Sequence, residues 1–162
     1  MSETAPDQAD RAGTGPVEGI GSGRVDHVGI VVGDTAAAVQ MYAALLGLRA
    51  DPSLEVEREG VRLTFLRPTA GADATTVELL EPTRDDTGVA RFLERRGEGM
   101  HHVCFEVDDV QREIERLASL GYQVLDQQPR RGAHGERLAF VHPKSTRGVL
   151  IELYERGSRQ AH

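Results

Sequence analysis

An internal repeat restricts the fold of this 162-residue chain more than any other feature of its sequence. Several residues recur 75 positions later (102 − 27), namely His27-Val28 as His102-Val103, Asp34 as Asp109, and Leu45 as Leu120. A further stretch recurs 74 positions later (152 − 78), since Val77-Glu78-Leu79-Leu80 corresponds to Ile151-Glu152-Leu153-Tyr154. We interpret the chain as a tandem duplication of one structural unit.

Each half has the pattern of a β-α-β-β-β unit. In the first half, a β-branched run predicts a strand over 24–32, and Asp34 can cap an amphipathic helix that ends at Gly47. The apolar residues at helical spacing in that helix are Ala38, Val39, Tyr42, Leu45 and Leu46. Strands are expected at about 48–56, 61–67 and 74–80. The second half repeats this order with a strand over 101–107, a helix that follows Asp109 and runs to Leu120, and strands at about 122–126, 136–141 and 148–154.

The segments outside the two units are short. We predict a flexible tail at 1–23, which has no periodic apolar pattern, and a second tail at 157–162. The first unit spans 24–81, a connector with one short helix spans 82–99, and the second unit spans 100–156. The fold class is therefore α+β, with two tandem βαβββ modules.

Composition and charge exclude several classes of function. The formal net charge is −7 and the pI is about 5.4, and no run of Lys and Arg could form the basic surface of a nucleic-acid-binding protein. No apolar run approaches the roughly 20 residues that cross a bilayer, so we expect no membrane association. Cys104 is the only cysteine, which favours a reducing compartment and a cytoplasmic location.

Each unit carries one histidine in its first strand and one glutamate in its last strand. Alternation along the first strand directs its aliphatic residues under the helix and His27 to the opposite face. The same alternation directs Glu78, His102 and Glu152 to that face in their own strands. When two such units pair with pseudo-twofold symmetry, these four side chains can converge on one point.

Two imidazoles and two carboxylates form a mixed nitrogen and oxygen site for one divalent metal ion. Zinc, cobalt, nickel, manganese and iron(II) all accept such ligands. A single histidine or glutamate on a strand is usually an ordinary surface or core residue. Four such residues at matching repeat positions, each flanked by aliphatic residues, instead indicate a metal site.

The sequence resembles the vicinal-oxygen-chelate superfamily and, within it, the methylmalonyl-CoA epimerase family, from about Val25 to Glu155. The resemblance rests on six stretches, of which the middle four are more specific to the epimerases: Val25-Asp26-His27-Val28, Val77-Glu78-Leu79-Leu80-Glu81-Pro82, 99–109, Gly132-Ala133-His134-Gly135, His142-Pro143-Lys144-Ser145 and 148–153.

This resemblance implies a fold, a metal and a reaction. It implies a vicinal-oxygen-chelate fold with a metal-centred concave sheet, whose ligands are His27, Glu78, His102 and Glu152 and whose expected ion is cobalt. Epimerases of this type interconvert the C2 epimers of methylmalonyl-CoA, so we expect an acyl-CoA substrate and a homodimer. Removal of the proton between a thioester and a carboxylate yields an enolate, whose charge a chelated divalent cation stabilises.

Inversion at C2 requires proton removal on one face and proton return on the other. Glu152 is expected to be one acid/base group in addition to its metal role. Some family members carry a second glutamate at the position of Leu63, and leucine cannot transfer a proton. Glu106 or a water molecule at the metal is the expected substitute, while Glu57 and Glu59 are weaker candidates.

Several loop residues are candidates for substrate contact. Lys144 and Ser145, on a turn before the last strand, could hold the substrate carboxylate or a CoA phosphate, with a plain surface turn as the alternative. His134 lies in a glycine loop and is expected to shape the site or to contact the substrate. The pairs Arg95-Arg96 and Arg130-Arg131 are expected to be solvated, with contact to CoA phosphates as the alternative.

Other members of the superfamily provide alternative functions. A glyoxalase-I-like lyase uses the same four ligands on a glutathione adduct, and the loop motifs around His134 and Lys144 favour the epimerase over it. A drug-sequestering protein commonly lacks the metal ligands, and an iron dioxygenase would use two histidines and one glutamate. A diverged relative with other enolate chemistry or small-molecule binding also stays open.

Overall fold

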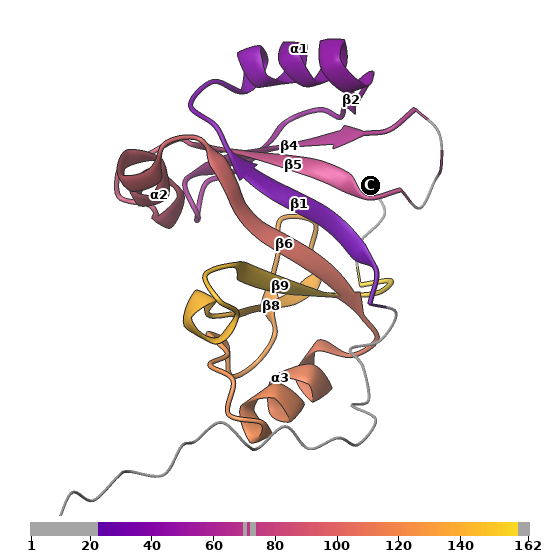
Figure 1. Cartoon of the computed structure of the whole chain (residues 1–162), viewed down its shortest axis with the longest axis vertical. Helices are drawn as coiled ribbons and strands as arrows, with labels where there is room; N and C mark the ends of the chain where they lie inside the picture. The colour runs from indigo at the N-terminus through magenta and orange to yellow at the C-terminus, as the bar shows by residue number, and fades with distance from the viewer. Residues whose placement is uncertain (1–22, 70, 72–73, 159–162) are drawn as a thin grey trace, which may run out of the picture.

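The computed structural model describes residues 23–69, 71 and 74–158 (Figure 1). The tails expected at 1–23 and 157–162 lie outside this range, apart from Gly23, Gly157 and Ser158. No helix within the described residues is long and apolar enough to cross a membrane.

The element order confirms the duplication. The first half consists of β1 (Val25–Val31), α1 (Thr35–Leu46), β2 (Arg49–Ala50), β3 (Leu54–Val56), β4 (Val61–Arg67) and β5 (Thr76–Pro82). The connector contains α2 (Gly88–Arg96). The second half consists of β6 (Gly99–Val107), α3 (Val110–Ser119), β7 (Arg130–Arg131), β8 (Arg137–Val141), the 3-10 helix η1 (Pro143–Ser145) and β9 (Leu150–Glu155).

All strands of the described residues belong to one nine-stranded mixed sheet. Its order is β2-β4-β5-β1-β6-β9-β8-β7, and β3 pairs with β4. In each half the first strand pairs in parallel with the last, β1 with β5 and β6 with β9. The two halves join where β1 and β6 pair antiparallel in the middle of the sheet (Figure 1). The α+β prediction is therefore confirmed, and the first and last strands of each unit are neighbours as expected.

Three apolar clusters follow the predicted alternation of the strands. One lies under α1 and contains Val32, Ala38 and Leu79, and another lies under α3 and contains Val107 and Leu153. These clusters occupy the outer face of the sheet, which α1 and α3 cover (Figure 1). The third cluster lies on the inner face, where α2 packs against β1, β4 and β5. The outer face thus holds most of the core, and the inner face is left for the site.

The second half of α1 differs from the expected amphipathic helix. Ala38 is buried, and Val39 and Tyr42 pack against the same cluster. Leu45 and Leu46, also counted in the apolar stripe, are exposed together with Met41. This end of the helix extends beyond the part of α1 that packs on the sheet, so burial of its leucines could not be read from helical spacing alone.

Two predicted strands also differ from the structure. The strand expected at 48–56 is split into β2 and β3, and Pro52 lies in the gap, where its missing N–H cannot join a ladder. The strand expected at 122–126 is reduced to one bridge between Val124 and Val141. The two-residue strand β7 pairs with the opposite end of β8, at Arg137 and Leu138.

The N-cap of α3 allows a direct test of the helix start. Oδ1 of Asp109 accepts a hydrogen bond from the N–H of Arg112 at 3.1 Å. We expect Asp109→Ala to lower the free energy of unfolding by about 1 kcal/mol in urea titrations, because it leaves that N–H without its protein acceptor. Asp108→Ala, at the exposed neighbouring carboxylate, should change it by less than about 0.5 kcal/mol. Equal losses in both variants would contradict the capping role.

Candidate metal centre and its cavity

The pairing of the strands places the four predicted ligands around the centre of the sheet. In β1, Gly29 lies opposite Glu78 of β5 on one side and opposite His102 of β6 on the other. In β6, Cys104 lies opposite Glu152 of β9 and opposite His27 of β1. Gly29 and Cys104 are themselves 75 positions apart (104 − 29), so these pairings are related by the internal symmetry.

Small residues at these two positions let the imidazoles lie close to the sheet. A Cβ atom on Gly29 would lie 2.2 Å from Cε1 and 2.4 Å from Nδ1 of His102, so only glycine leaves room for this ring. The equivalent position beside His27 is the small residue Cys104, which is fully buried. The close approach of both rings to the sheet is what lets them meet between the two halves.

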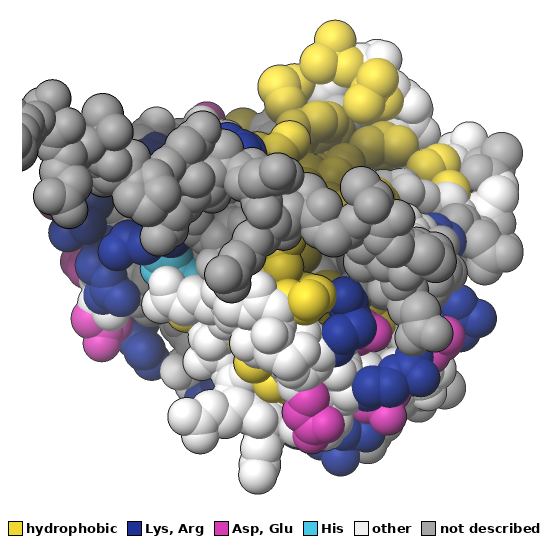
Figure 2. Space-filling model, turned by 60° about the horizontal axis from the view of Figure 1, so that its bottom comes forward, with side chains coloured by type: hydrophobic (Ala, Val, Ile, Leu, Met, Phe, Trp, Pro, Cys, Tyr) yellow, Lys and Arg dark blue, Asp and Glu magenta, His cyan; other side chains and the backbone are white. Residues whose placement is uncertain are grey.

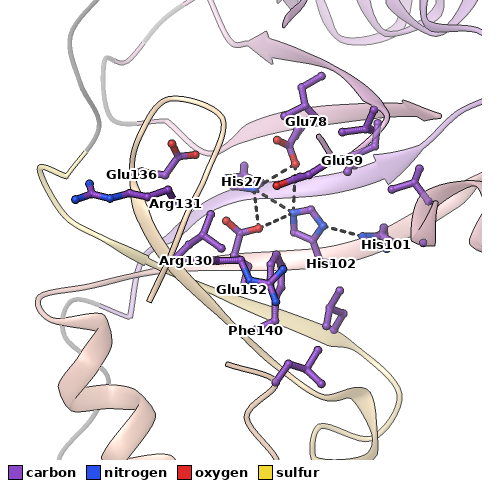
Figure 3. Close-up of a pocket in the computed structure, with 18 residues that line it drawn as sticks. His27, Glu59, Glu78, His101, His102, Arg130, Arg131, Glu136, Phe140 and Glu152 are labelled. Atoms are coloured by element: carbon purple, nitrogen blue, oxygen red, sulfur yellow. Dashed lines mark hydrogen bonds and ion pairs between the residues drawn. The ribbon is translucent and has the colours of Figure 1, made fainter. Parts of the chain in front are cut away.

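The four side chains converge at the base of a cavity (Figure 3). Nε2 of His27 and Nε2 of His102 are 3.1 Å apart. Oε2 of Glu78 lies 3.5 Å from the first nitrogen and 3.3 Å from the second. Oε2 of Glu152 lies 3.7 Å and 3.2 Å from the same atoms. All four residues are at most 6% exposed, so these polar atoms are directed at one another and away from bulk water.

The ligand atoms of His27, His102 and Glu152 all lie within 4.8 Å of one another, and Glu78 adds an oxygen 3.3 Å from His102, so this donor set fits a divalent metal ion. Metal–ligand bonds of about 2.0–2.2 Å place the ligand atoms of one ion roughly 3 to 3.5 Å apart, as most of these atoms are. The other nitrogen of each imidazole forms a hydrogen bond outside the cluster. Nδ1 of His27 is hydrogen-bonded to Oδ2 of Asp26 at 2.9 Å, and Nδ1 of His102 to Nδ1 of His101 at 3.0 Å. With the protons on these Nδ1 atoms, both Nε2 lone pairs point into the cluster, as in known metal sites with an outer hydrogen-bonding shell.

Burial and neighbouring charges shift the ionisation of the histidines. Burial disfavours the charged form of His27 and by itself would lower its pKa. Hydrogen bonds to Asp26, Cys104 and Glu152 and the charge of Glu78 act in the opposite direction. Together they outweigh burial, so the pKa of His27 is raised well above its ordinary value. Metal binding must displace that proton, so metal affinity should increase with pH. Burial and the neighbouring His102 lower the pKa of His101 to about 4. Neutral His101 can accept the Nδ1 proton of His102.

Asp26, His27 and Cys104 also lie close enough together to suggest a second metal site. Burial raises the pKa of the Cys104 thiol, and the charge of Glu152 adds to the effect. A protonated thiol is a poor metal ligand. Asp26 instead bonds Nδ1 of His27 and forms a salt bridge with Arg24. We therefore assign this group to the positioning of His27.

The ligands open into a cavity of 390 Å³. Its apolar wall includes Leu63, the residue at which the resemblance implies a glutamate in some family members. Glu106 is not among the described residues that line the cavity. Its carboxylate bonds Arg24 at 2.6 Å and Arg156 at 2.7 Å, and these arginines lower the pKa of Glu106. The structure therefore does not bring this predicted acid/base residue to the metal ligands, although its strand position gives it the same orientation as His102.

The predicted substrate contacts also lie away from the ligands. Lys144 and Ser145 form part of η1 and are not among the described residues that line the cavity, and Oγ of Ser145 accepts a hydrogen bond from the N–H of Gln123. The ring of His134 packs against Phe65, with centroids 5.8 Å apart. His134 thus helps to seat its loop on β4, in line with a shaping role.

Besides the predicted ligands, four charged residues of the described chain line the cavity: Glu59, Arg130, Arg131 and Glu136. Glu59 is a weaker acid/base candidate from the sequence, and only Glu136 was not predicted there to have a role. Strand alternation could have identified Glu136, since Glu136, Leu138 and Phe140 all line the cavity while Ala139 and Val141 pack under α3. The arginine pair could not be placed from sequence because β7 has only two residues.

A basic groove of 480 Å³ adjoins the cavity, with which it shares Gly88, His101 and Leu150. Three arginines of α2 line it: Arg91, Arg95 and Arg96. None of them forms a salt bridge with a carboxylate of the described residues, whereas arginines elsewhere, such as Arg62 and Arg137, do. In a chain of net charge −7, this groove is a local concentration of unneutralised positive charge.

Comparison with known proteins identifies relatives that cover most of the chain. Residues 26–140 match the Glyoxalase/Bleomycin resistance protein/Dioxygenase superfamily. An ethylmalonyl-CoA/methylmalonyl-CoA epimerase of Cereibacter sphaeroides is 37% identical over 133 residues, which are 81% of this chain and 96% of that protein.

Solved structures show the same similarity. The methylmalonyl-CoA epimerase of Mycobacterium tuberculosis superposes with a TM-score of 0.77 at 32% identity, over 86% of this chain and 91% of that one. A methylmalonyl-CoA epimerase in complex with methylmalonyl-CoA and NH4+ has a TM-score of 0.76 and 37% identity, over 85% of this chain and 98% of that one.

Proposed function

The chain belongs to the Glyoxalase/Bleomycin resistance protein/Dioxygenase superfamily, and we propose that it is a metal-dependent epimerase that interconverts the C2 epimers of methylmalonyl-CoA. One observation carries this proposal: imidazole nitrogens and carboxylate oxygens from both halves converge at the base of a cavity. The similarity to epimerases over more than four-fifths of the chain supports the choice of substrate.

The ligand residues and the cavity wall have separate tasks in this reaction. The four convergent side chains would hold the metal, and a bound divalent cation would supply Lewis-acid stabilisation for the negative charge that develops when C2 loses its proton. Oε2 of Glu152 faces the other ligands, and we assign acceptance of the C2 proton to Oε1 of the same carboxylate. Leu63, Leu80 and Leu138 line the cavity and keep water from the deprotonated carbon.

The basic groove favours an acyl-CoA over the glutathione adduct of a glyoxalase-like lyase. CoA carries several phosphate groups, and arginine is well suited to bind phosphate. Arg91, Arg95 and Arg96 lie in a groove that opens from the cavity, where the nucleotide end of an acyl-CoA could extend. We therefore assign the CoA phosphates to this groove.

Proton NMR in deuterated water tests the proposed reaction. We expect the metal-loaded protein to exchange the C2 proton of methylmalonyl-CoA for deuterium and to equilibrate the two epimers without net breakdown. The adduct of glutathione with a 2-oxoaldehyde should remain unchanged. Absence of exchange in a metal-replete sample would remove the assignment.

Charge reversal on α2 tests the assignment of the CoA phosphates. We expect Arg91→Glu combined with Arg96→Glu to raise KM for methylmalonyl-CoA about tenfold with little change in kcat, because the groove would repel the phosphates. KM for methylmalonyl-pantetheine, which carries no phosphate, should stay the same. Arg49→Glu on β2 is the matched control and should leave both constants unchanged. An equal rise in KM for both substrates would contradict the assignment.

Three finer features also belong to this proposal: cobalt as the ion, a homodimer and a cytoplasmic location. Met41, Leu45 and Leu46 form an exposed apolar surface on α1. Figure 2 shows hydrophobic side chains gathered at the end of the molecule where Figure 1 places α1, and such surfaces mark association sites. Metal analysis of the purified protein and light scattering test the first two features. The single, buried and reduced Cys104 supports the third.

A further inference from the structure

Epimerisation through Glu152 alone leaves one face of C2 without an acid/base group. A proton removed on one face must be replaced on the other for inversion to occur. Leu63 carries no exchangeable proton, and Glu106 is held by two arginines outside the cavity. Among the described residues that line the cavity, the carboxylates other than the two metal ligands are Glu59 and Glu136.

These two carboxylates differ in their surroundings. Glu59 is about half exposed and forms a salt bridge with Arg58 at 3.2 Å. Glu136 is only 7% exposed and forms no salt bridge with a basic residue of the described chain. Its Oε2 accepts a hydrogen bond of 2.7 Å from the backbone N–H of His134. A carboxylate that lines a reaction cavity and is not held by a basic side chain is a candidate general acid or base.

The hairpin between β7 and β8 holds Glu136 in this position. The N–H of Gly132 bonds the carbonyl of Glu136, and a Cβ atom on Gly132 would lie 2.4 Å from Oε1 of the glutamate. Ala133, in the same hairpin, packs against the cluster that contains Leu63. Glu136 is therefore brought to the β4 side of the cavity from another element, whereas Glu152 comes from β9 (Figure 3).

We infer that Glu136 is the second catalytic acid/base residue, acting on the face of C2 opposite Glu152. This inference rests on the proposed function. In one direction, Glu152 takes the C2 proton, the electron pair of the broken C–H bond delocalises into the adjacent carbonyl groups, and protonated Glu136 donates a proton to form the new C–H bond. In the other direction the two carboxyl groups exchange roles. Proton exchange with solvent then restores the starting protonation states.

The experiment uses Glu136→Gln with each C2 epimer separately in deuterated water. We expect inversion to fall about 100-fold or more in both directions. The epimer whose C2 proton faces Glu152 should still exchange that proton without inversion, whereas the other epimer should not. Metal content should equal that of the wild type, and Glu136→Asp should recover part of the inversion. Glu59→Gln is the matched control and should invert both epimers at rates within twofold of the wild type.

Three outcomes would overturn the inference. The first is wild-type inversion by Glu136→Gln. The second is equal loss of exchange from both epimers while metal content is retained, which would indicate a structural role. The third is that Glu59→Gln, and not Glu136→Gln, exchanges the C2 proton of one epimer only. Absence of exchange of either epimer in the wild type would instead remove the proposed function, so the two failures are distinguishable.

Discussion

Replacing His102 with alanine is expected to abolish stoichiometric metal binding and to lower epimerase activity by a factor on the order of 10³. The substitution removes the nitrogen that lies 3.2 to 3.3 Å from the oxygens of both Glu78 and Glu152. Glu78 and Glu152 are then left with one imidazole between them instead of two, and the charge that develops on the substrate loses its stabilising cation. Metal analysis after dialysis and the C2 exchange measurement give independent readouts of this effect.

His142 provides the matched histidine control. It lies outside the metal cavity, where its Nδ1 accepts a hydrogen bond from the N–H of Lys144 at the start of η1. His142→Ala should therefore retain its metal. A His102→Ala protein that kept one equivalent of metal and near-normal exchange would show that the convergent geometry does not represent the functional centre.

Replacing Gly29 with alanine should also disable the site, although Gly29 has no functional group. The added methyl would lie 2.2 Å from the ring of His102, far inside van der Waals contact, so the ring must move. We expect a loss of about 1–3 kcal/mol in the free energy of unfolding, as for overpacked cores. Displacing one ligand should also weaken metal affinity at least tenfold, as the loss of outer-shell support does in other metal sites. Thermal unfolding with and without added metal separates the two effects.

Gly33, shortly after β1, is the appropriate control. A Cβ atom there would meet nothing closer than 3.5 Å, so Gly33→Ala should leave metal affinity unchanged. If Gly29→Ala also bound metal with wild-type affinity, His102 would have another ring position from which it can serve as a ligand, and the need for glycine at this point would be disproved.

The fold and the approach of the four ligands could be predicted because both follow from periodic patterns. The repeat that relates His27 to His102 implies two similar units, and strand alternation decides which side chains share a face. These rules depend only on the local geometry of a strand and on the symmetry of a duplication. They also explain why Gly29 and Cys104, at equivalent positions, are both small.

The sequence could not separate Glu106 from Glu136 as a candidate for the second acid/base residue. Both have positions in the predicted strands that are compatible with the inner face. In the structure, however, Glu106 meets Arg24 and Arg156, which are 82 and 50 positions away in the chain. Glu136 reaches the cavity because a hairpin folds over β4. Alternation along a strand sets the direction of a side chain. The partners that it meets depend on contacts between distant segments, which no local pattern in the sequence encodes, and these arise only when the chain has folded.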